Sequence, residues 1–296
     1  MISSPALPLA DLAIHLNFNG KTQKGMQFRQ IPPPEYLKDY IRFFWVMESN
    51  DTDISAASFR TVADGCPGLI FQHPDKGILF QNDKQLPGTI LYGQATRHAE
   101  LRINGRFNTI GIFFYPHALK SIFGLNADEL TDTCIDLDGM ADKQGFRLSE
   151  QLSNLSASQA QIDTLCTYLL AQINRNTQFT DKAMQHVLDR IKQANGNISV
   201  KELREELQLS ERSFERRFKQ HIGITPKLFT RISRFQASMH LLRQSDYNKL
   251  SDIAFENEYA DQSHFIRAFK EFAGFSPFQF QKRSKELIEN LSILTK

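Results

Sequence analysis

The stretch SERSFERRFKQHIG in the C-terminal third carries charged side chains at positions i, i+3, i+4 and i+7, namely Arg212, Glu215, Arg216 and Lys219. On a helix this spacing places them along one stripe. Arginine can donate two hydrogen bonds to O6 and N7 of guanine, and lysine can reach a phosphate. The stripe therefore has the chemistry to read DNA, although a single helix of this kind is more often only a solvated charged face.

The stretch is repeated. SFERRFKQHIGITP, which begins at Ser213, aligns with HFIRAFKEFAGFSP, which begins at His264, at a constant offset of 51 residues. The identical pairs are Phe214 and Phe265, Arg216 and Arg267, Phe218 and Phe269, Lys219 and Lys270, Gly223 and Gly274, and Pro226 and Pro277. The second stripe consists of Ser263, Ile266, Arg267 and Lys270, with Gln262 and His264 beside it. The duplication favours a functional surface, and two copies are too few for a solenoid array.

Each copy has the pattern of a helix-turn-helix motif. In the first copy, Ser199 and Glu202 have the spacing of a capping box, and Ser210 is placed to cap a second helix after a short turn. We predict the two motifs at residues 199–221 and 251–273, with one extra residue in the second turn.

A linker helix is predicted between the motifs, at residues 226–244, because Pro226 suits the first position of a helix. Such a helix is about 28 Å long, near the ~34 Å pitch of B-DNA. Residues 182–296 hold 20 Lys and Arg against 14 Asp and Glu, whereas residues 1–181 hold 15 against 19. The basic back of the chain is therefore expected to place both stripes in adjacent segments of the major groove.

The front of the chain is predicted to be β-rich. From Phe28 to Pro116, runs such as IRFFWVME, GLIFQ and FNTIGIFFY are rich in aromatic and β-branched residues. Turns with Gly, Pro, Asn and Asp separate them at intervals of roughly ten residues, which favours a β-sandwich or barrel.

After residue 145 the apolar period becomes that of helices. One stripe is formed by Ile162, Leu165, Cys166, Leu169, Leu170 and Ile173, and a second by Met184, Val187, Leu188 and Ile191. We expect such stripes to pack into a domain of their own or, alternatively, to join two chains. The predicted organisation is a flexible arm at 1–25, a β-rich sensor or dimerisation domain at 26–145, a helical connector at 146–181 and a DNA-binding domain at 182–296.

The stretch DIAFENEYADQSHFIRAFKEFAGFSPFQFQ, Asp252 to Gln281, closely resembles the signature of AraC/XylS-type transcriptional regulators, and residues 190–283 are similar to their DNA-binding domain. The resemblance implies core positions for Ile253 and Ala254. It implies base- or backbone-contacting positions for Arg212, Glu215, Arg216, Gln262, Ser263, His264 and Arg267. The family's turn glycine is replaced by Gln208 and Glu258, which is expected to strain a left-handed backbone position or to shift the turn.

The front part resembles an N-terminal domain of some of these regulators, through PPEYLKDYIRFFW (Pro33 to Trp45) and GIFFYPHALKSIFG (Gly111 to Gly124). The resemblance implies an α+β protein, with a cupin-like β-rich domain followed by an all-α domain. The implied partners are promoter or operator DNA, RNA polymerase, and either a small-molecule effector or a second copy of the chain. It identifies no effector and no effector-binding residues, and we expect no cofactor.

Two enzymatic alternatives stay open. A cupin-like barrel also suits a metal enzyme, but His73, His98 and His117 lack an H-x-H pattern. A thiol-dependent alkyl-transfer regulator fused to a DNA-binding domain would need a reactive cysteine. Cys66, in GCPG, is the only thiol that suits that role, and nothing near it in sequence is expected to lower its pKa. We therefore expect no catalysis and no metal site.

Composition supports a globular protein that acts in the cytoplasm. A hydrophobic content of 41% and a charged content of 23% are ordinary for this class. Apolar runs fall well short of a membrane span, and the N-terminus lacks the pattern of a signal peptide. Cys66, Cys134 and Cys166 lie far apart in sequence and are expected to be free thiols.

Overall fold

The computed structural model describes residues 17–18, 26–49, 56–244, 247 and 249–282. The flexible arm predicted at 1–25 lies outside these residues, except that Asn17–Phe18 forms strand β1. Within the described part of the chain, no helix has the length and apolar character needed to span a bilayer.

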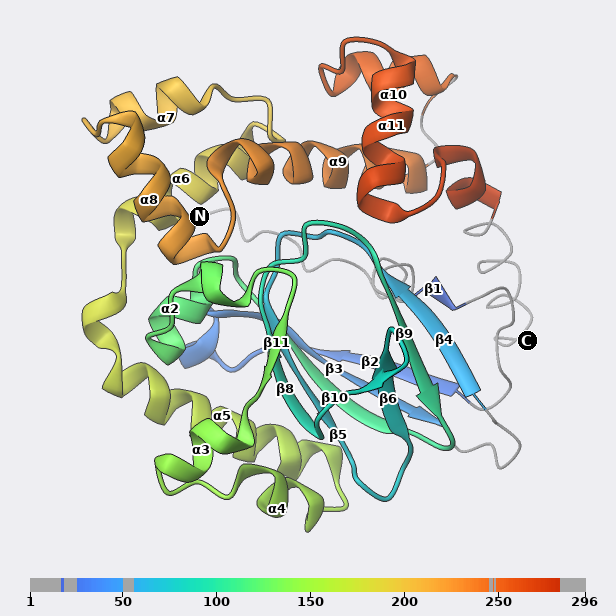
Figure 1. Cartoon of the computed structure of the whole chain (residues 1–296), viewed down its shortest axis with the longest axis vertical. Helices are drawn as coiled ribbons and strands as arrows, with labels where there is room; N and C mark the ends of the chain where they lie inside the picture. Colours follow the sequence, from blue (N-terminus) through green and yellow to red (C-terminus); the bar gives the residue numbers. More distant parts are fainter. Residues whose placement is uncertain (1–16, 19–25, 50–55, 245–246, 248, 283–296) are drawn as a thin grey trace.

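The front of the chain folds into two antiparallel sheets (Figure 1). The six-stranded sheet has the order β11-β8-β5-β10-β3-β2, and the five-stranded sheet has the order β1-β4-β9-β6-β7. The strands are β2 Met26–Ile31, β3 Ile41–Ser49, β4 Ala56–Thr61, β5 Gly68–Gln72, β6 Ile78–Gln81, β7 Lys84–Gln85, β8 Thr89–Tyr92, β9 Ala99–Asn104, β10 Asn108–Phe114 and β11 Cys134–Asp136. Apart from the β6–β7 hairpin, strands β3 to β10 alternate between the sheets in the order of a jelly roll, the architecture of cupins. The predicted cupin-like domain is confirmed.

Strand β3 is apolar along nearly its whole length because both of its faces are buried. Phe43 and Trp45 point between the two sheets, whereas Phe44 and Val46 point to the outer side of the six-stranded sheet. The aromatic residues of the strands thus fill two packed cores.

The outer face of the six-stranded sheet is covered by helices (Figure 1). They are α2 Ala118–Phe123, α3 Asp138–Lys143, α4 Leu148–Ser153 and α5 Ser158–Arg175, and the 3-10 turn η2, Ala127–Leu130, follows α2. The stripe of α5 is buried here, apart from Leu170, which is 38% exposed. The stripe therefore packs within the chain, and the jelly roll rather than a second chain supplies its partner.

The C-terminal helices form a second body around a core rich in phenylalanine. They are α6 Lys182–Gln193, α7 Val200–Glu206, α8 Glu211–Ile222, α9 Pro226–Gln244, α10 Leu250–Glu256 and α11 Gln262–Ala273. Phe218 of the first motif and Phe269 of the second are fully buried in this core, and the stripe of α6 packs there too. Val62 and Ala63, from the loop after β4, belong to the same core. The helical body is thus completed by the front domain.

The helix caps match the sequence only in part. Ser210 caps α8, as predicted, by accepting a hydrogen bond from the backbone N–H of Ser213. Ser199 caps α7 through the N–H of Lys201, but the predicted capping box is wrong. The carboxylate of Glu202 instead accepts a hydrogen bond from Arg190 of α6, because the two helices pack side by side.

The turns inside both motifs use a left-handed residue that is not glycine. Gln208 has φ of +54° and Glu258 has φ of +52°, so the expected strain is present at equivalent positions. A left-handed conformation costs an L-residue about 1–2 kcal/mol, and glycine escapes this cost but loses more entropy on folding.

We expect Glu258→Gly to raise the free energy of unfolding by about 0.5–1 kcal/mol, the difference between these two effects. Chemical denaturation of the full chain measures the change. Glu256→Gly, in the last turn of α10, is the matched control and should lower the stability instead. A loss of stability in the Glu258 variant would show that the turn is not strained.

Candidate nucleic-acid interface

Helix α8 exposes the first predicted stripe. Arg212, Glu215 and Arg216 are exposed and Lys219 is half-buried. The opposite face of the helix, through Phe218, anchors it in the helical core. The stripe is therefore held rigidly and presented to solvent.

Helix α11 exposes most of the second stripe, namely Gln262, Ser263, Arg267 and Lys270. His264 and Ile266 differ from the expectation of open exposure. His264 is half-buried with its ring edge-on to Tyr259, at 5.5 Å between centroids, and Ile266 packs partly against the helical core. The periodicity of α11 alone could not show this, because Tyr259 lies in the turn before the helix and the partners of Ile266 lie in the helical core.

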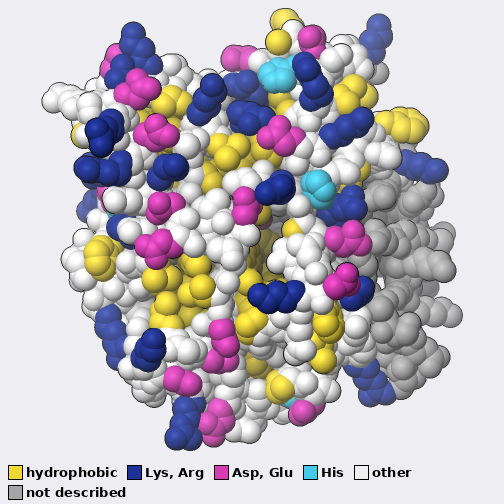
Figure 2. Space-filling view, viewed as in Figure 1, with side chains coloured by type: hydrophobic (Ala, Val, Ile, Leu, Met, Phe, Trp, Pro, Cys, Tyr) yellow, Lys and Arg dark blue, Asp and Glu magenta, His cyan; other side chains and the backbone are white. Residues whose placement is uncertain are grey.

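Within the described residues, the cations of the two stripes form no ion pair. They are Arg212, Arg216, Lys219, Arg267 and Lys270. Their charges are consequently available to an anionic partner. Figure 2 shows Lys and Arg side chains gathered over the C-terminal helices, interspersed with Asp and Glu. Such a distribution suits a polyanion that is contacted at selected points.

Helices α8 and α11, here called the reading helices, point the same way. The C-terminal ends of α8 and α11 meet the jelly roll, and their N-terminal ends lie on the far side of the helical body (Figure 1). Helix α9 runs between the motifs and has 19 residues, or about 28 Å. Recognition helices contact bases mainly through their N-terminal residues, so the surface opposite the jelly roll is the candidate interface.

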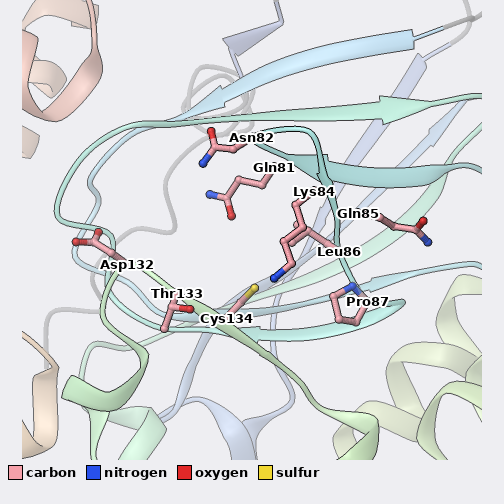
Figure 3. Close-up of a pocket in the computed structure, with 9 residues that line it drawn as sticks. All are labelled: Gln81, Asn82, Lys84, Gln85, Leu86, Pro87, Asp132, Thr133 and Cys134. Carbon is pink, nitrogen blue, oxygen red and sulfur yellow. The ribbon is translucent and has the colours of Figure 1, made fainter.

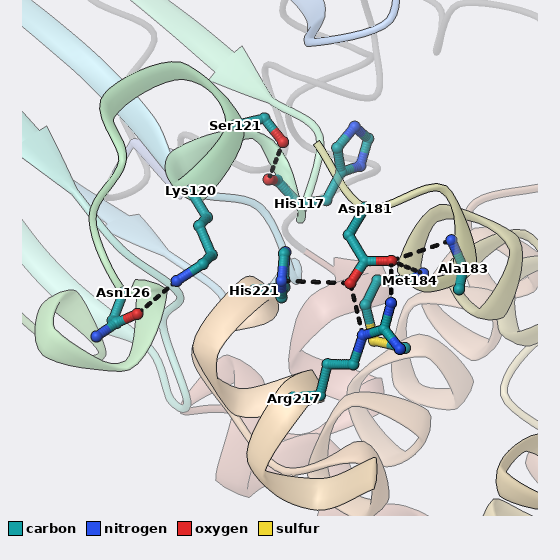
Figure 4. Close-up of polar contacts among 9 residues, drawn as sticks. All are labelled: His117, Lys120, Ser121, Asn126, Asp181, Ala183, Met184, Arg217 and His221. Carbon is teal, nitrogen blue, oxygen red and sulfur yellow. Dashed lines mark hydrogen bonds and ion pairs between the residues drawn. The ribbon is translucent and has the colours of Figure 1, made fainter. Parts of the chain in front are cut away.

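A buried polar cluster holds the start of α6 against α8 (Figure 4). The Asp181 carboxylate accepts hydrogen bonds from Nε and Nη2 of Arg217, at 2.7 and 2.8 Å, and lies 3.3 Å from Nε2 of His221. It also caps α6 through the N–H groups of Ala183 and Met184. Arg217 is thus a structural residue, although it directly follows a stripe residue in sequence.

Burial and the polar contacts of this cluster together shift the pKa values of its members. Burial acts to raise the pKa of Asp181, but the hydrogen bonds from Arg217 and Met184 outweigh it, so that pKa lies below its usual value. Burial lowers the pKa of His221 despite the nearby Asp181 carboxylate. The sequence analysis missed the cluster, although a signal was present: Arg217 aligns with Ala268 in the repeat.

The residues of the enzymatic alternatives lie in separate places. His73 contacts the Ser153 carbonyl oxygen, His98 that of Glu271, and His117 that of Asp39. Within the described residues, no three His, Cys, Asp or Glu side chains are grouped to hold a metal ion. The arrangement gives no support to the metal-enzyme alternative.

The thiol alternative meets a similar obstacle. Cys66 is buried and accepts a hydrogen bond from Arg42, and burial raises the pKa of its thiol to about 11. A thiol is nucleophilic as its thiolate, so this pKa disfavours reaction at neutral pH. Cys66, Cys134 and Cys166 are all free, as expected.

A groove of about 620 Å³ lies at the seam between the two sheets (Figure 3). Its walls come from the β6–β7 hairpin and from the segment that enters β11, which are edge strands of different sheets. The lining is mixed, with Lys84 and Asp132 as its charged residues, while Leu86 and Cys134 also pack against the core between the sheets.

Comparisons with known proteins follow this division of the chain. Residues 203–283 match the family described as a helix-turn-helix domain, and residues 29–136 match a domain of unknown function, DUF6597. An uncharacterised transcriptional regulator of this helix-turn-helix type from Haemophilus influenzae is 30% identical over 148 residues, which are 46% of this chain and 49% of that protein. The transcriptional activator RhaS of Escherichia fergusonii is 29% identical over 154 residues, which are 47% of this chain and 54% of RhaS. The chain therefore spans about half the length of these relatives.

Among solved structures, ToxT from Vibrio cholerae aligns over 88% of this chain and 99% of its own, with a TM-score of 0.43 and 14% identity. The family is decided by the C-terminal third, where the duplicated motif, the residue order from Asp252 to Gln281 and the helix-turn-helix match coincide. The helix-turn-helix domain of the chain is of the AraC/XylS type.

Proposed function

We propose that the protein is a sequence-specific DNA-binding transcriptional regulator that acts in the cytoplasm. The proposal is carried by the two duplicated reading helices, whose N-terminal halves expose Arg212, Arg216 and Arg267, and these arginines form no ion pair within the described residues. Helices α8 and α11, which α9 connects, enter adjacent segments of the major groove. Titration of the full chain against the upstream region of its own gene and against random duplex tests the proposal.

The side chains divide into two roles. Arg212, Arg216 and Arg267 face the base edges, where arginine reads guanine by two hydrogen bonds. Glu215, Gln262, Ser263, His264 and Ile266 complete the reading surface. Lys219 and Lys270 lie nearer the C-terminal ends of their helices and contact phosphates, which fix the register but carry no base information.

We expect Lys270→Ala to weaken binding to specific and random duplex alike and to reduce the slope of log K against log salt by about one. The reason is that one phosphate contact releases about one counterion. Equilibrium binding at four salt concentrations measures the slope. Lys143→Ala, an exposed lysine on α3 of the front domain, is the control and should leave both quantities unchanged. A loss confined to the specific duplex would contradict the phosphate role.

The regulator is further proposed to activate transcription, and the related RhaS is named a transcriptional activator. We propose that the bound helical body does so by contacting RNA polymerase. Transcription in vitro from the bound promoter, with and without the protein, tests this step. A decrease of transcript would make the protein a repressor instead.

The front domain is proposed to bind a small-molecule effector or to join two chains. The groove between β7 and β11 supports the first possibility, because Leu86 and Cys134 of its lining pack against the apolar core between the sheets. Trp45 belongs to that core and is the single tryptophan of the chain, so its fluorescence reports a ligand that changes the packing of this core. A flat response to a compound panel, together with a concentration-dependent increase in mass, would favour dimerisation.

A further inference from the structure

The jelly roll holds both reading helices at equivalent points. The cap residues Gly223 of α8 and Gly274 of α11 are related by the repeat, and both adopt left-handed backbone conformations, with φ of +101° and +76°. Each of these glycines lies directly against residues of the front domain. The contacts therefore act on the backbone at the end of each reading helix.

The first contact fixes α8. Thr131 donates a hydrogen bond from Oγ1 to the carbonyl oxygen of Gly223, at 2.6 Å. A Cβ atom on Gly223 would lie 3.0 Å from the carbonyl oxygen of Ala127 and 3.2 Å from Cγ of Gln94, so the glycine is closely enclosed. Gln94 and Ala127 are fully buried. The front-domain residues that enclose Gly223, here called the first socket, thus belong to η2, to the residue that follows it and to the loop after β8. The residues that enclose Gly274 are called the second socket.

The second contact fixes α11. Arg60 of β4 donates a hydrogen bond from Nη1 to the carbonyl oxygen of Gly274, at 3.4 Å. The ring of His98 covers the same glycine, and a Cβ atom there would lie 2.5 Å from the ring. Between the two sockets, Gln236 of α9 donates a hydrogen bond to the carbonyl oxygen of Ala63, at 2.6 Å.

One loop connects the two sockets. Residues 93–98 join β8 of the six-stranded sheet to β9 of the five-stranded sheet, with Gln94 at one end against Gly223 and His98 at the other against Gly274. The middle of the loop is tied down, because Thr96 donates hydrogen bonds to the Asp132 carboxylate from its N–H and its Oγ1, at 2.7 and 2.5 Å. The distance between the sockets is consequently fixed by the jelly roll.

We propose that the jelly roll sets the separation and relative angle of α8 and α11, so that Thr131 and His98 are positioning residues for operator spacing. The proposal rests on the proposed DNA-binding function. Helix α9 and the shared phenylalanine-rich core already hold the two motifs together. The sockets add direct contacts from the jelly roll to the end of each reading helix, and so make the chain select one spacing between its two DNA elements.

The test uses the full chain and a duplex enriched from a random pool by the wild-type protein. One base pair is inserted between the two DNA segments that the bound reading helices cover. The insertion moves these segments apart by about 3.4 Å and rotates one relative to the other by about 35°. We expect the insertion to weaken wild-type binding at least about tenfold, like a mismatch in a specific site. In the variant T131V/H98A the same insertion should cost less than about threefold, while the enriched duplex still binds.

The control T167V/H73A removes a threonine hydroxyl and an imidazole from outside the sockets, and Thr131→Ser keeps the hydroxyl at the socket. Both should show the wild-type penalty, as should any variant that merely loses stability. A T131V/H98A protein with an undiminished penalty would overturn the inference. Thr131→Val alone, with an intermediate penalty expected, gives the same decision where the double variant does not fold. No enrichment of any duplex by the wild-type chain would instead contradict the proposed function.

Discussion

Arg267→Ala is expected to weaken binding to the specific duplex by about 1–3 kcal/mol and to relax the base preference at one position of the site. Arg267 is exposed on α11 and makes no ion pair within the described residues, so its guanidinium is free to donate two hydrogen bonds to a guanine edge. Arg216 is its counterpart on α8, and Arg216→Ala should relax the preference at a position in the other element. Binding to duplexes carrying each base substitution measures both effects.

The matched control is Arg147→Ala, an exposed arginine of the front domain whose partner is Glu150. Its binding should equal that of the wild type. Equal losses on specific and random duplex for Arg216 and Arg267 would contradict the assigned base contacts. Losses at the same base position for both would show that the two helices do not occupy separate segments of the groove.

The second large effect concerns His117, which is 9% exposed and lies at the start of α2. Its Nε2 atom is 3.2 Å from the carbonyl oxygen of Asp39, a hydrogen-bond distance. Burial lowers the pKa of His117 to about 4, and the hydrogen bond to Asp39 offsets this only in part. In the unfolded chain the pKa is near 6.5. Between these two values the unfolded state binds more protons, so this residue lowers the stability as the pH falls from about 6.5 to about 4.

We expect the stability of the wild type relative to His117→Gln to fall by about 2 kcal/mol when the pH is lowered from 7.5 to 5. The comparison with the variant is necessary because burial raises the pKa of Asp64 to about 6, and that carboxyl titrates with the opposite sign in both proteins. Urea denaturation at the two pH values measures the difference. A difference that does not change with pH would show that His117 is not buried as a neutral imidazole.

Much of the fold could be predicted from local signals in the sequence. Ser210 capped α8 and Pro226 began α9 because these preferences depend on neighbouring backbone groups alone. Strand β9 was not predicted, although Leu101 and Ile103 alternate with charged and polar residues, which is the pattern of a strand with one buried face. The repeat located both stripes, but the half-burial of Ile266 depends on contacts that only the folded helical body creates.

Contacts between segments that are distant in sequence could not be predicted from the sequence pattern. The predicted boundary at residue 182 separates Asp181 from its partner Arg217, although the carboxylate both caps α6 and fixes α8. Ala63 lies more than a hundred residues before α9, yet its backbone completes the core of the helical body. Experiments on DNA binding therefore need the full chain.

The most direct test of the central claim is equilibrium binding of the full chain to the upstream region of its own gene and to random duplex at two salt concentrations. We expect tighter binding to the upstream region, with a weaker dependence on salt than for random duplex, because base contacts add to the phosphate contacts. Equal and steeply salt-dependent binding to both duplexes would contradict sequence-specific recognition and leave only a surface that binds polyanions.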